Sequence, residues 1–251
     1  MEVNMIVCVA ENNLIGDKNP EGNGLLWHSK EELNYFKEKT IGNVVIFGKN
    51  TAKCVPIELM KKNRDVIVIS SKDNFNDIVD QYKYIDKDIF ICGGATVYKD
   101  FLEKYKMDNI YISVLKSHID VKKPNKPLYF PNIEEFGYEI VESVEYNDFT
   151  VYKYQNKTYN KILKELEEKN FCCLRKRKNI ESDNILMTEL TELIVRKETI
   201  EFEDGRIKHL YFIKYEKFDN FYTRAIFNMT HLNLKNLKKH LRKMLPLYEK
   251  K

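Results

Sequence analysis

The chain has 251 residues, with 42 Lys and Arg against 38 Asp and Glu and a formal net charge of +4. This length allows one large domain, or a medium domain with a small one. It contains no stretch of about 18 uninterrupted apolar residues, so we expect no membrane span. The N-terminal segment has neither a basic start nor a small-residue cleavage site, so we also expect no secretion signal.

Five cysteines, an odd number, are spread along the chain, and no two of them have the spacing of zinc ligands. The adjacent Cys172 and Cys173 are more typical of buried thiols than of a metal site. We therefore expect no bound metal and a reducing, cytoplasmic compartment.

The charge is divided unevenly. Residues 1–155 carry 20 Lys and Arg against 24 Asp and Glu, whereas residues 156–251 carry 22 against 14. Such a change of sign suggests two modules, and we predict one domain over 1–155 and a basic one over 156–251. Nucleic acid or an acidic protein would suit the basic part as a partner, and a merely solvated basic face is the alternative.

Short apolar runs alternate with helical patterns in residues 1–155. Five runs are mostly β-branched and too short for buried helices, which indicates strands covered on both faces. They are Met5–Ala10, Val44–Phe47, Val66–Ile69, Ile89–Cys92 and Ile110–Leu115. Strand and helix in alternation predict an α/β domain with a mostly parallel central sheet flanked by helices.

The first predicted helix is Glu31–Thr40, with Leu33 and Phe36 at helical spacing and Ser29 placed to cap its start. The second is Ala95–Lys104, whose apolar residues form one stripe.

Later in this part, the segments Tyr138–Tyr146 and Phe149–Tyr154 flank Asn147-Asp148. This pattern predicts a hairpin that closes the sheet with antiparallel edge strands.

After Gln155 we predict a small α+β domain of order α-β-β-β-α. Its first helix carries a stripe of Tyr159, Ile162, Leu163 and Leu166, and a charged loop follows at Leu174–Asn184. The three predicted strands are Leu190–Phe202, Ile207–Tyr215 and Phe221–Asn228, with a turn at Asp204-Gly205. A final helix with Lys and Arg around its stripe carries Leu232, Leu237, Leu241 and Met244 on one face.

The strongest chemical signal lies near the N-terminus. The loop from Gly16 to Gly24 is rich in glycine and polar residues, which predicts a mobile lid. Trp27, the only tryptophan, is predicted to open a helix on which Glu32 and Phe36 face the same way. A carboxylate beside apolar groups has a raised pKa and can bond to the polar edge of a heteroaromatic ring. In isolation, however, Glu32 is more simply a surface residue.

Four further motifs follow in an order and spacing that resemble the dihydrofolate reductase family over residues 5–155. Val44–Thr51 resembles the family's strand and Gly-Arg-x-Thr turn, and Asn63–Ser71 resembles its Arg-bearing strand. Ile89–Tyr98 resembles its Gly-Gly turn and following helix, and Tyr111–Val114 resembles the strand with a hydroxyl. The resemblance implies that family's fold and the NADPH-dependent reduction of 7,8-dihydrofolate to tetrahydrofolate, with antifolates as further ligands.

The resemblance also implies a catalytic set of Glu32, Trp27 and Ser113. Glu32 would bind the pteridine amide and amino edge and promote protonation of the nitrogen next to the hydride-accepting carbon. Ser113 stands where the family usually has Thr, whose hydroxyl bonds to that carboxylate. Arg64 would pair with the glutamate-tail carboxylate of folate, although a surface ion pair is the alternative. The pteridine pocket would be walled by Ile6, Val7, Cys8, Leu33, Phe36 and Cys92.

On the cofactor side, Gly93 and Gly94 would let the backbone approach the pyrophosphate of NADPH, and the helix from Ala95 would present its amino end. Lys49 would meet a phosphate, and Ser70 or Ser71 would reach the ribose phosphate. The full implied set is Ala10, Ile15, Gly16, Gly48, Lys49, Asn50, Thr51, Ser70, Ser71, Gly93, Gly94, Ala95, Thr96, Val97 and Tyr98.

Two positions depart from the family's pattern. Leu26 replaces a proline, which loosens a turn beside the lid. Lys49 replaces an arginine and loses bidentate binding, so we predict a preference for NADPH over NADH that is weaker than typical.

Other functions remain to be weighed. A pyrimidine reductase of riboflavin synthesis shares the fold, but Trp27 and Glu32 suit a pterin. A structural or nucleic-acid-associated protein could have recruited a reductase fold, but it would not need Glu32, Arg64 and Ser113 together. A fused thymidylate synthase is not supported, because the 96 residues of the tail are too few.

Aromatic residues are frequent in the tail: Tyr211, Phe212, Tyr215, Phe218, Phe221, Tyr222 and Phe227. They could form a stacking platform for single-stranded nucleic acid. We favour core and cross-strand pairs, which such spacing more often indicates.

Overall fold

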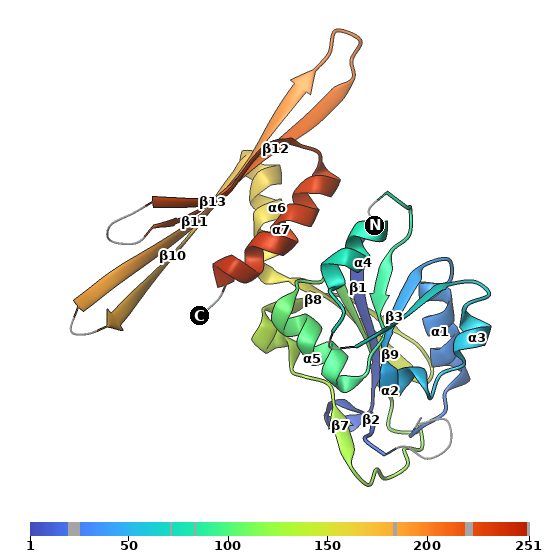
Figure 1. The fold of residues 1–251 in the computed structure, drawn as a ribbon. Helices are drawn as coiled ribbons and strands as arrows, with labels where there is room; N and C mark the ends of the chain where they lie inside the picture. Colours follow the sequence, from blue (N-terminus) through green and yellow to red (C-terminus); the bar gives the residue numbers. More distant parts are fainter. Residues whose placement is uncertain (20–25, 71, 83, 183–184, 219–222, 250–251) are drawn as a thin grey trace. The chain divides into compact units, whose positions relative to one another are not determined.

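The computed structural model describes residues 1–251 except 20–25, 71, 83, 183–184, 219–222 and 250–251 (Figure 1). The chain divides into two compact units, Met1–Asn156 and Lys157–Lys251, called here the N-terminal unit and the C-terminal unit. Within the described residues, no helix is both long enough and apolar enough to cross a membrane.

The N-terminal unit is built on a seven-stranded sheet with the strand order β4-β3-β5-β1-β6-β9-β8. The strands are β1 (Val3–Val9), β3 (Val44–Gly48), β4 (Asp65–Ile69), β5 (Ile89–Ile91), β6 (Asn109–Leu115), β8 (Tyr138–Glu145) and β9 (Phe149–Asn156). The five strands from β4 to β6 in this order are parallel, whereas β9 pairs antiparallel with both β6 and β8. The predicted parallel sheet with a closing hairpin is therefore confirmed.

Helices cover both faces of this sheet. They are α1 (Lys30–Thr40), α2 (Lys49–Ala52), α3 (Ile57–Met60), α4 (Phe75–Tyr82) and α5 (Ala95–Lys104). One buried cluster joins α4 and α5 to the sheet through Phe75, Phe101 and Leu102. A second cluster joins α1 and α3 to the opposite face through Tyr35 and Met60. α5 has the bounds predicted from its stripe.

Smaller elements complete the N-terminal unit. A two-stranded sheet pairs β2 (Leu14–Asp17) with β7 (Pro127–Tyr129). Two short 3-10 helices, η1 (Glu11–Asn13) and η2 (Ile133–Phe136), lie before β2 and before β8. The predicted lid thus begins in a strand at Gly16, and its residues 20–24 lie outside the described residues.

The structure corrects two predictions about α1: that Trp27 opens it, and that Leu33 is on its inner side. The helix begins at Lys30, because Ser29 has an extended backbone and its hydroxyl accepts a hydrogen bond from the Glu32 N–H at 3.1 Å. Trp27 therefore precedes the helix instead of opening it. The buried side chains of α1 include Glu32 and Tyr35, whereas Leu33 is 42% exposed. The side of α1 that faces the sheet is therefore shifted by one residue from the predicted stripe.

The C-terminal unit has the elements α6 (Lys157–Lys169), β10 (Phe171–Ser182), β11 (Ile185–Glu201), β12 (Ile207–Phe218), β13 (Thr223–Leu232) and α7 (Leu234–Glu249). The strands form an antiparallel sheet in sequence order, and α6 and α7 lie side by side on one of its faces (Figure 1). The small α+β domain is confirmed, with one strand more than predicted.

The extra strand, β10, occupies most of the predicted loop Leu174–Asn184, so that prediction was wrong. Cys172 and Leu174 point into the core, and Arg175 points away and pairs with Glu192 at 2.7 Å. Buried Cys172 and Leu174 alternate with exposed Phe171 and Arg175, which is the pattern of a half-buried strand. Residues 183–184 lie outside the described residues.

The core of the C-terminal unit is apolar and aromatic. Tyr211 and Tyr215 are buried in it together with Ile162, Leu193 and Leu241. The core interpretation of the tail aromatics is therefore confirmed at these two positions, and neither ring is available for stacking. Phe221 and Tyr222, and the side chain of Phe227, lie outside the described residues.

Candidate active site

Three elements of the N-terminal unit meet at Glu32. Glu32 lies in the first turn of α1, Cys8 on β1 and Ser113 on β6, and the last two residues are direct partners in the parallel register. Glu32 is 8% exposed and Ser113 is fully buried. The first turn of α1 therefore places a carboxyl group over the two central strands, where apolar surroundings exclude most water.

Burial determines the protonation of Glu32. Loss of water raises the pKa of this carboxyl from 4.5 to about 7, and the side chains of Ser113 and Cys8 hold it below the value that burial alone would give. Near neutral pH, the protonated and ionised forms are therefore both populated. Such a group can hold a proton and release it to a bound molecule at physiological pH.

Cys8 and Trp27 form the neighbourhood of this carboxyl. Burial and the nearby Glu32 charge raise the pKa of the Cys8 thiol well above its usual value, so the thiol stays protonated. Trp27 packs with Ala10 and Leu26 in a small buried cluster that Cys8 also touches. Although Trp27 lies before the helix, this packing brings it beside Cys8, which was predicted as a wall of the pocket.

Arg64 is buried at the other end of α1. Its Nε donates to Thr40 Oγ1 at 2.8 Å, and its Nη2 donates to the Lys37 carbonyl at 3.2 Å. Its Nη1 donates to Asn63 Oδ1 at 2.7 Å. This guanidinium group is thus held by the last turn of α1, and it forms no ion pair with any residue that the structure describes.

The predicted pocket walls are only partly brought together. Ile6 and Cys92 are buried on the face that α1 covers, and Phe36 packs against the same cluster. Val7 points to the opposite face, into the cluster with α5, so only its backbone lies on this side. Leu33 is on the exposed side of α1.

The predicted cofactor loops do come together. The Gly48 N–H donates to the Gly93 carbonyl at 2.7 Å, which joins the end of β3 to the turn after β5. A Cβ atom at Gly48 would lie 2.8 Å from Val97 Cγ2, and one at Gly94 would lie 2.6 Å from Thr51 Oγ1. A larger residue at either position would have to displace the Val97 or Thr51 side chain, and the backbone amides at the first turn of α5 lie beside this junction.

Other predicted cofactor residues surround this junction. The Tyr98 hydroxyl, on α5, donates to the Ile6 carbonyl at 2.8 Å and ties the helix to β1. Lys49 and Asn50 are exposed in α2. Ala95 and Thr96 form the start of α5, and Ala10, Ile15 and Gly16 lie at the end of β1 and in β2.

Ser70 has a partner that the sequence did not indicate. Its backbone N–H and its hydroxyl both donate to Asp73 Oδ2, at 2.6 and 2.8 Å. The bonds from Ser70 hold the pKa of the Asp73 carboxyl below its usual value, so this group carries a negative charge where a ribose phosphate was expected. Ser71 lies outside the described residues.

Known proteins resemble this chain in the same region. The sequence model of the dihydrofolate reductase family matches residues 2–161. The chain belongs to the dihydrofolate reductase family. The dihydrofolate reductase of Mycoplasma genitalium is 27% identical over 168 residues, covering 61% of this chain and 96% of that protein. That of Buchnera aphidicola subsp. Acyrthosiphon pisum is 25% identical over 147 residues, covering 55% and 84%.

Among solved structures, a dihydrofolate reductase from Enterococcus faecalis complexed with NADP(H) and RAB-propyl is 22% identical, with a TM-score of 0.49. The similarity covers 62% of this chain and 96% of that one. The family match ends at residue 161, close to the boundary between the two units, so most of the C-terminal unit lies beyond the dihydrofolate reductase match.

Residues that the sequence analysis missed lie around this dihydrofolate reductase site. Asp73 lay outside the quoted motifs. Asp148 was noted only as part of a hairpin turn, yet its carboxylate accepts a hydrogen bond from Ser29 at 2.6 Å. The two residues are 119 positions apart, and no local pattern connects them.

Proposed function

We propose that this chain reduces 7,8-dihydrofolate to tetrahydrofolate with NADPH, and that Glu32 is the group that assists protonation of the pteridine. The observation that carries the proposal is a buried carboxyl whose pKa is about 7, set between Cys8 and Ser113 in a dihydrofolate reductase fold. A scaffold protein has no use for a buried carboxyl of this kind, because it destabilises the fold once ionised.

The residues present fit a dinucleotide. A Cβ atom at Gly48 or Gly94 would lie within 3 Å of a Val97 or Thr51 side-chain atom, so the glycines let the two turns pack together at the amino end of α5, which favours anionic oxygens. Gly93, Gly94 and Thr96 would hold the pyrophosphate, with Lys49 near a phosphate. When bound, the cofactor supplies the hydride.

The protein residues supply orientation and one proton. Trp27 and Leu26 cover the neighbourhood of Glu32 and exclude water. The Glu32 carboxyl would hold a proton against the pteridine edge and promote its transfer to the ring nitrogen. Arg64, fixed by α1, would present its guanidinium edge to the carboxylate of the substrate tail.

The test is the rate of NADPH oxidation in the presence of dihydrofolate. We expect turnover by the wild type and a decrease in kcat/KM of about 100-fold or more in Glu32→Gln, which cannot supply the proton. Glu38→Gln, on the exposed side of the same helix, is the control and should retain wild-type kinetics. Absence of wild-type turnover above the Glu32→Gln rate would refute the proposal.

We propose in addition that the C-terminal unit binds an acidic partner, nucleic acid in the first instance. The side of α7 away from its buried residues Leu237, Leu241 and Leu245 carries five cations. They are Lys235, Lys238, Lys239, Arg242 and Lys243. Because the apolar side of α7 is occupied by the core, a contact through this helix would rest on charge.

Titration of a labelled single-stranded oligonucleotide with the full chain, at low and high salt, tests this second proposal. We expect binding that weakens with salt and is lost in a Lys238→Glu/Arg242→Glu variant. A Lys161→Glu/Lys164→Glu variant, which makes the same change of charge on α6, is the control. No binding at low salt would exclude nucleic acid, and an acidic protein would then be the remaining candidate.

The cytoplasmic, reducing compartment stays a prediction. It can be tested by fractionating cells that contain the protein.

A further inference from the structure

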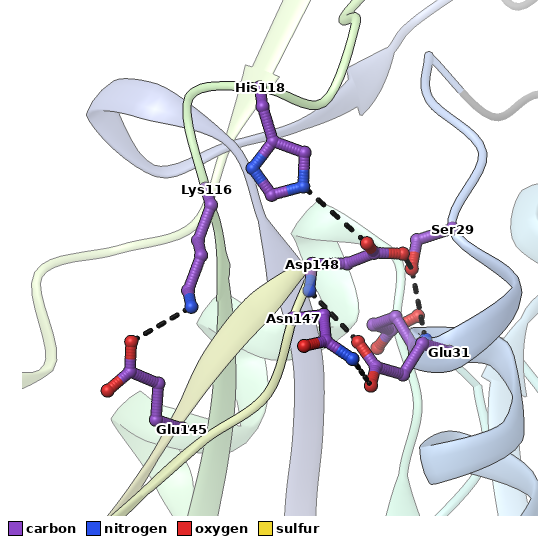
Figure 2. Close-up of polar contacts among 8 residues, drawn as sticks. Ser29, Glu31, Lys116, His118, Glu145, Asn147 and Asp148 are labelled. Carbon is purple, nitrogen blue, oxygen red and sulfur yellow. Dashed lines mark hydrogen bonds and ion pairs between the residues drawn. The ribbon is translucent and has the colours of Figure 1, made fainter.

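The turn between β8 and β9 is bonded to the start of α1 (Figure 2). Ser29 Oγ donates to Asp148 Oδ2 at 2.6 Å, and the Asp148 N–H donates to Glu31 Oε2 at 2.9 Å. Asn147 Nδ2 donates to the other Glu31 oxygen at 3.1 Å. Figure 2 shows these side chains converging between the hairpin turn and the first turn of the helix. We call Ser29, Glu31, Asn147 and Asp148 the hairpin latch.

The latch leads directly to the backbone of Glu32. Ser29 Oγ donates its proton to Asp148 and at the same time accepts the Glu32 N–H at 3.1 Å. Because a carboxylate is a strong acceptor, Asp148 fixes the orientation of the hydroxyl, and the hydroxyl then has its lone pairs directed at the helix. Ser29 is buried, so water does not compete strongly for these bonds.

Asp148 also contacts the segment that follows β6. Its carbonyl accepts the Lys116 N–H at 2.9 Å, and its carboxylate lies 3.6 Å from His118 Nε2. β6 carries Ser113, which lies beside the Glu32 carboxyl. Asp148 therefore bonds both to Ser29, at the start of the helix that carries Glu32, and to Lys116, directly after the strand that carries Ser113.

We propose that Asp148 is a positioning residue for the reaction: through Ser29 it holds the first turn of α1, and with it the Glu32 carboxyl, in the geometry needed for proton transfer. This inference rests on the proposed function of Glu32. Helix capping alone would need only an acceptor at position 29, whereas positioning needs the hydroxyl of Ser29 to donate to Asp148 as well.

The substitution Ser29→Asp separates the two roles. Aspartate is a good helix cap, so a capping role alone predicts wild-type kcat, with only the loss of stability that two facing carboxylates cause. Positioning predicts a decrease in kcat of about tenfold, because the new carboxylate would face Asp148 at hydrogen-bond distance and repel it. Adding Asp148→Asn supplies an amide donor to the new carboxylate, and the double variant should recover kcat to within about threefold of the wild type.

Asp148→Ala is the second variant, and it keeps the cap of Ser29 intact. We expect kcat to fall by about tenfold, with a smaller change in KM for dihydrofolate and a shift in the pH at which kcat/KM declines. Glu145→Gln is the matched control. Glu145, which is exposed, lies on the same hairpin and pairs with Lys116 at 2.9 Å, and no bond joins it to α1 among the residues that the structure describes (Figure 2).

The outcomes distinguish the latch from the proposed function. Wild-type kcat and pH profile in both Ser29→Asp and Asp148→Ala would overturn the positioning role while leaving the role of Glu32 intact. Kinetics of Asp148→Ala equal to those of Glu145→Gln would overturn it equally. No turnover by the wild type would instead refute the proposed function. Recovery of kcat in the Ser29→Asp/Asp148→Asn variant would support the latch, because it would show that the loss of kcat arises at the contact between positions 29 and 148.

Discussion

The two units of this chain treat polar groups in opposite ways. In the N-terminal unit the buried residues include Glu32, Arg64 and Ser113, which all belong to the candidate site. In the C-terminal unit, Thr191 is the buried polar residue identified among the described residues, and the core is otherwise apolar and aromatic.

This difference in buried polar groups indicates where the functional residues of each unit lie. Burying a polar group costs stability unless it is hydrogen-bonded, so an interior with several such groups needs a functional reason. The N-terminal unit has that reason in its dihydrofolate reductase site. No charged residue is buried in the part of the C-terminal unit whose burial the structure describes, and we expect the function of this unit to depend on its accessible charges.

Truncation of the two cores would test whether the units are independent. Leu193→Ala, in the C-terminal unit, should lower the free energy of unfolding of that unit by about 2–5 kcal/mol and leave the reductase kinetics unchanged. Ile46→Ala, in the N-terminal unit, should reduce both stability and activity. Urea unfolding, followed by circular dichroism and by activity, measures both effects. Equal loss of activity in the two variants would contradict independence.

The stability cost of the buried carboxyl can be measured directly. The pKa of Glu32 is raised from 4.5 to about 7, so the folded state keeps its proton to a higher pH than the unfolded chain does. Its contribution to stability is complete below pH 4.5 and is lost as the pH rises through 7.

At pH 8, Glu32→Gln should therefore stabilise the N-terminal unit by about 3 kcal/mol, with little effect at pH 4. Urea unfolding at the two pH values measures the difference. A gain of the same size at both would show that it does not come from ionisation of Glu32.

Ser113→Ala should move the pH profile. The Ser113 side chain lowers the pKa of Glu32, so its removal should raise that pKa and shift the decline of kcat/KM to higher pH. Ser113→Thr, which keeps a hydroxyl, should restore the wild-type profile. A shift to lower pH in Ser113→Ala would contradict the assignment of the titrating group to Glu32.

The smallest predicted effect concerns the choice of cofactor. The Asp73 carboxylate places a negative charge beside Ser70, where the ribose phosphate is expected. Lys49 lacks the planar guanidinium group of arginine. Asp73→Asn should increase the ratio of kcat/KM for NADPH over NADH by about fivefold or less, as for an exposed charge. Asp77→Asn, which is exposed in α4, is the control. An unchanged ratio would show that Asp73 does not face the phosphate.

Local signals predicted much of the fold. Ser29 followed by Glu32 correctly indicated the start of α1, and the stripe of α5 gave its bounds, because caps and helical periodicity act over a few residues. The run Leu174–Asn184 misled for the same reason. Its charges were assessed without knowing that Cys172 and Leu174 would be buried in a strand that pairs with β11.

The sequence by itself determined the alternation of strands and helices, the order of the family motifs and the selection of Glu32 as the candidate group for pteridine protonation. Only the tertiary structure decided that this carboxyl is desolvated between Cys8 and Ser113, and that Asp148 reaches Ser29 across 119 residues. Desolvation and long-range hydrogen bonds exist only once distant segments are packed together, and no pattern along the chain records them.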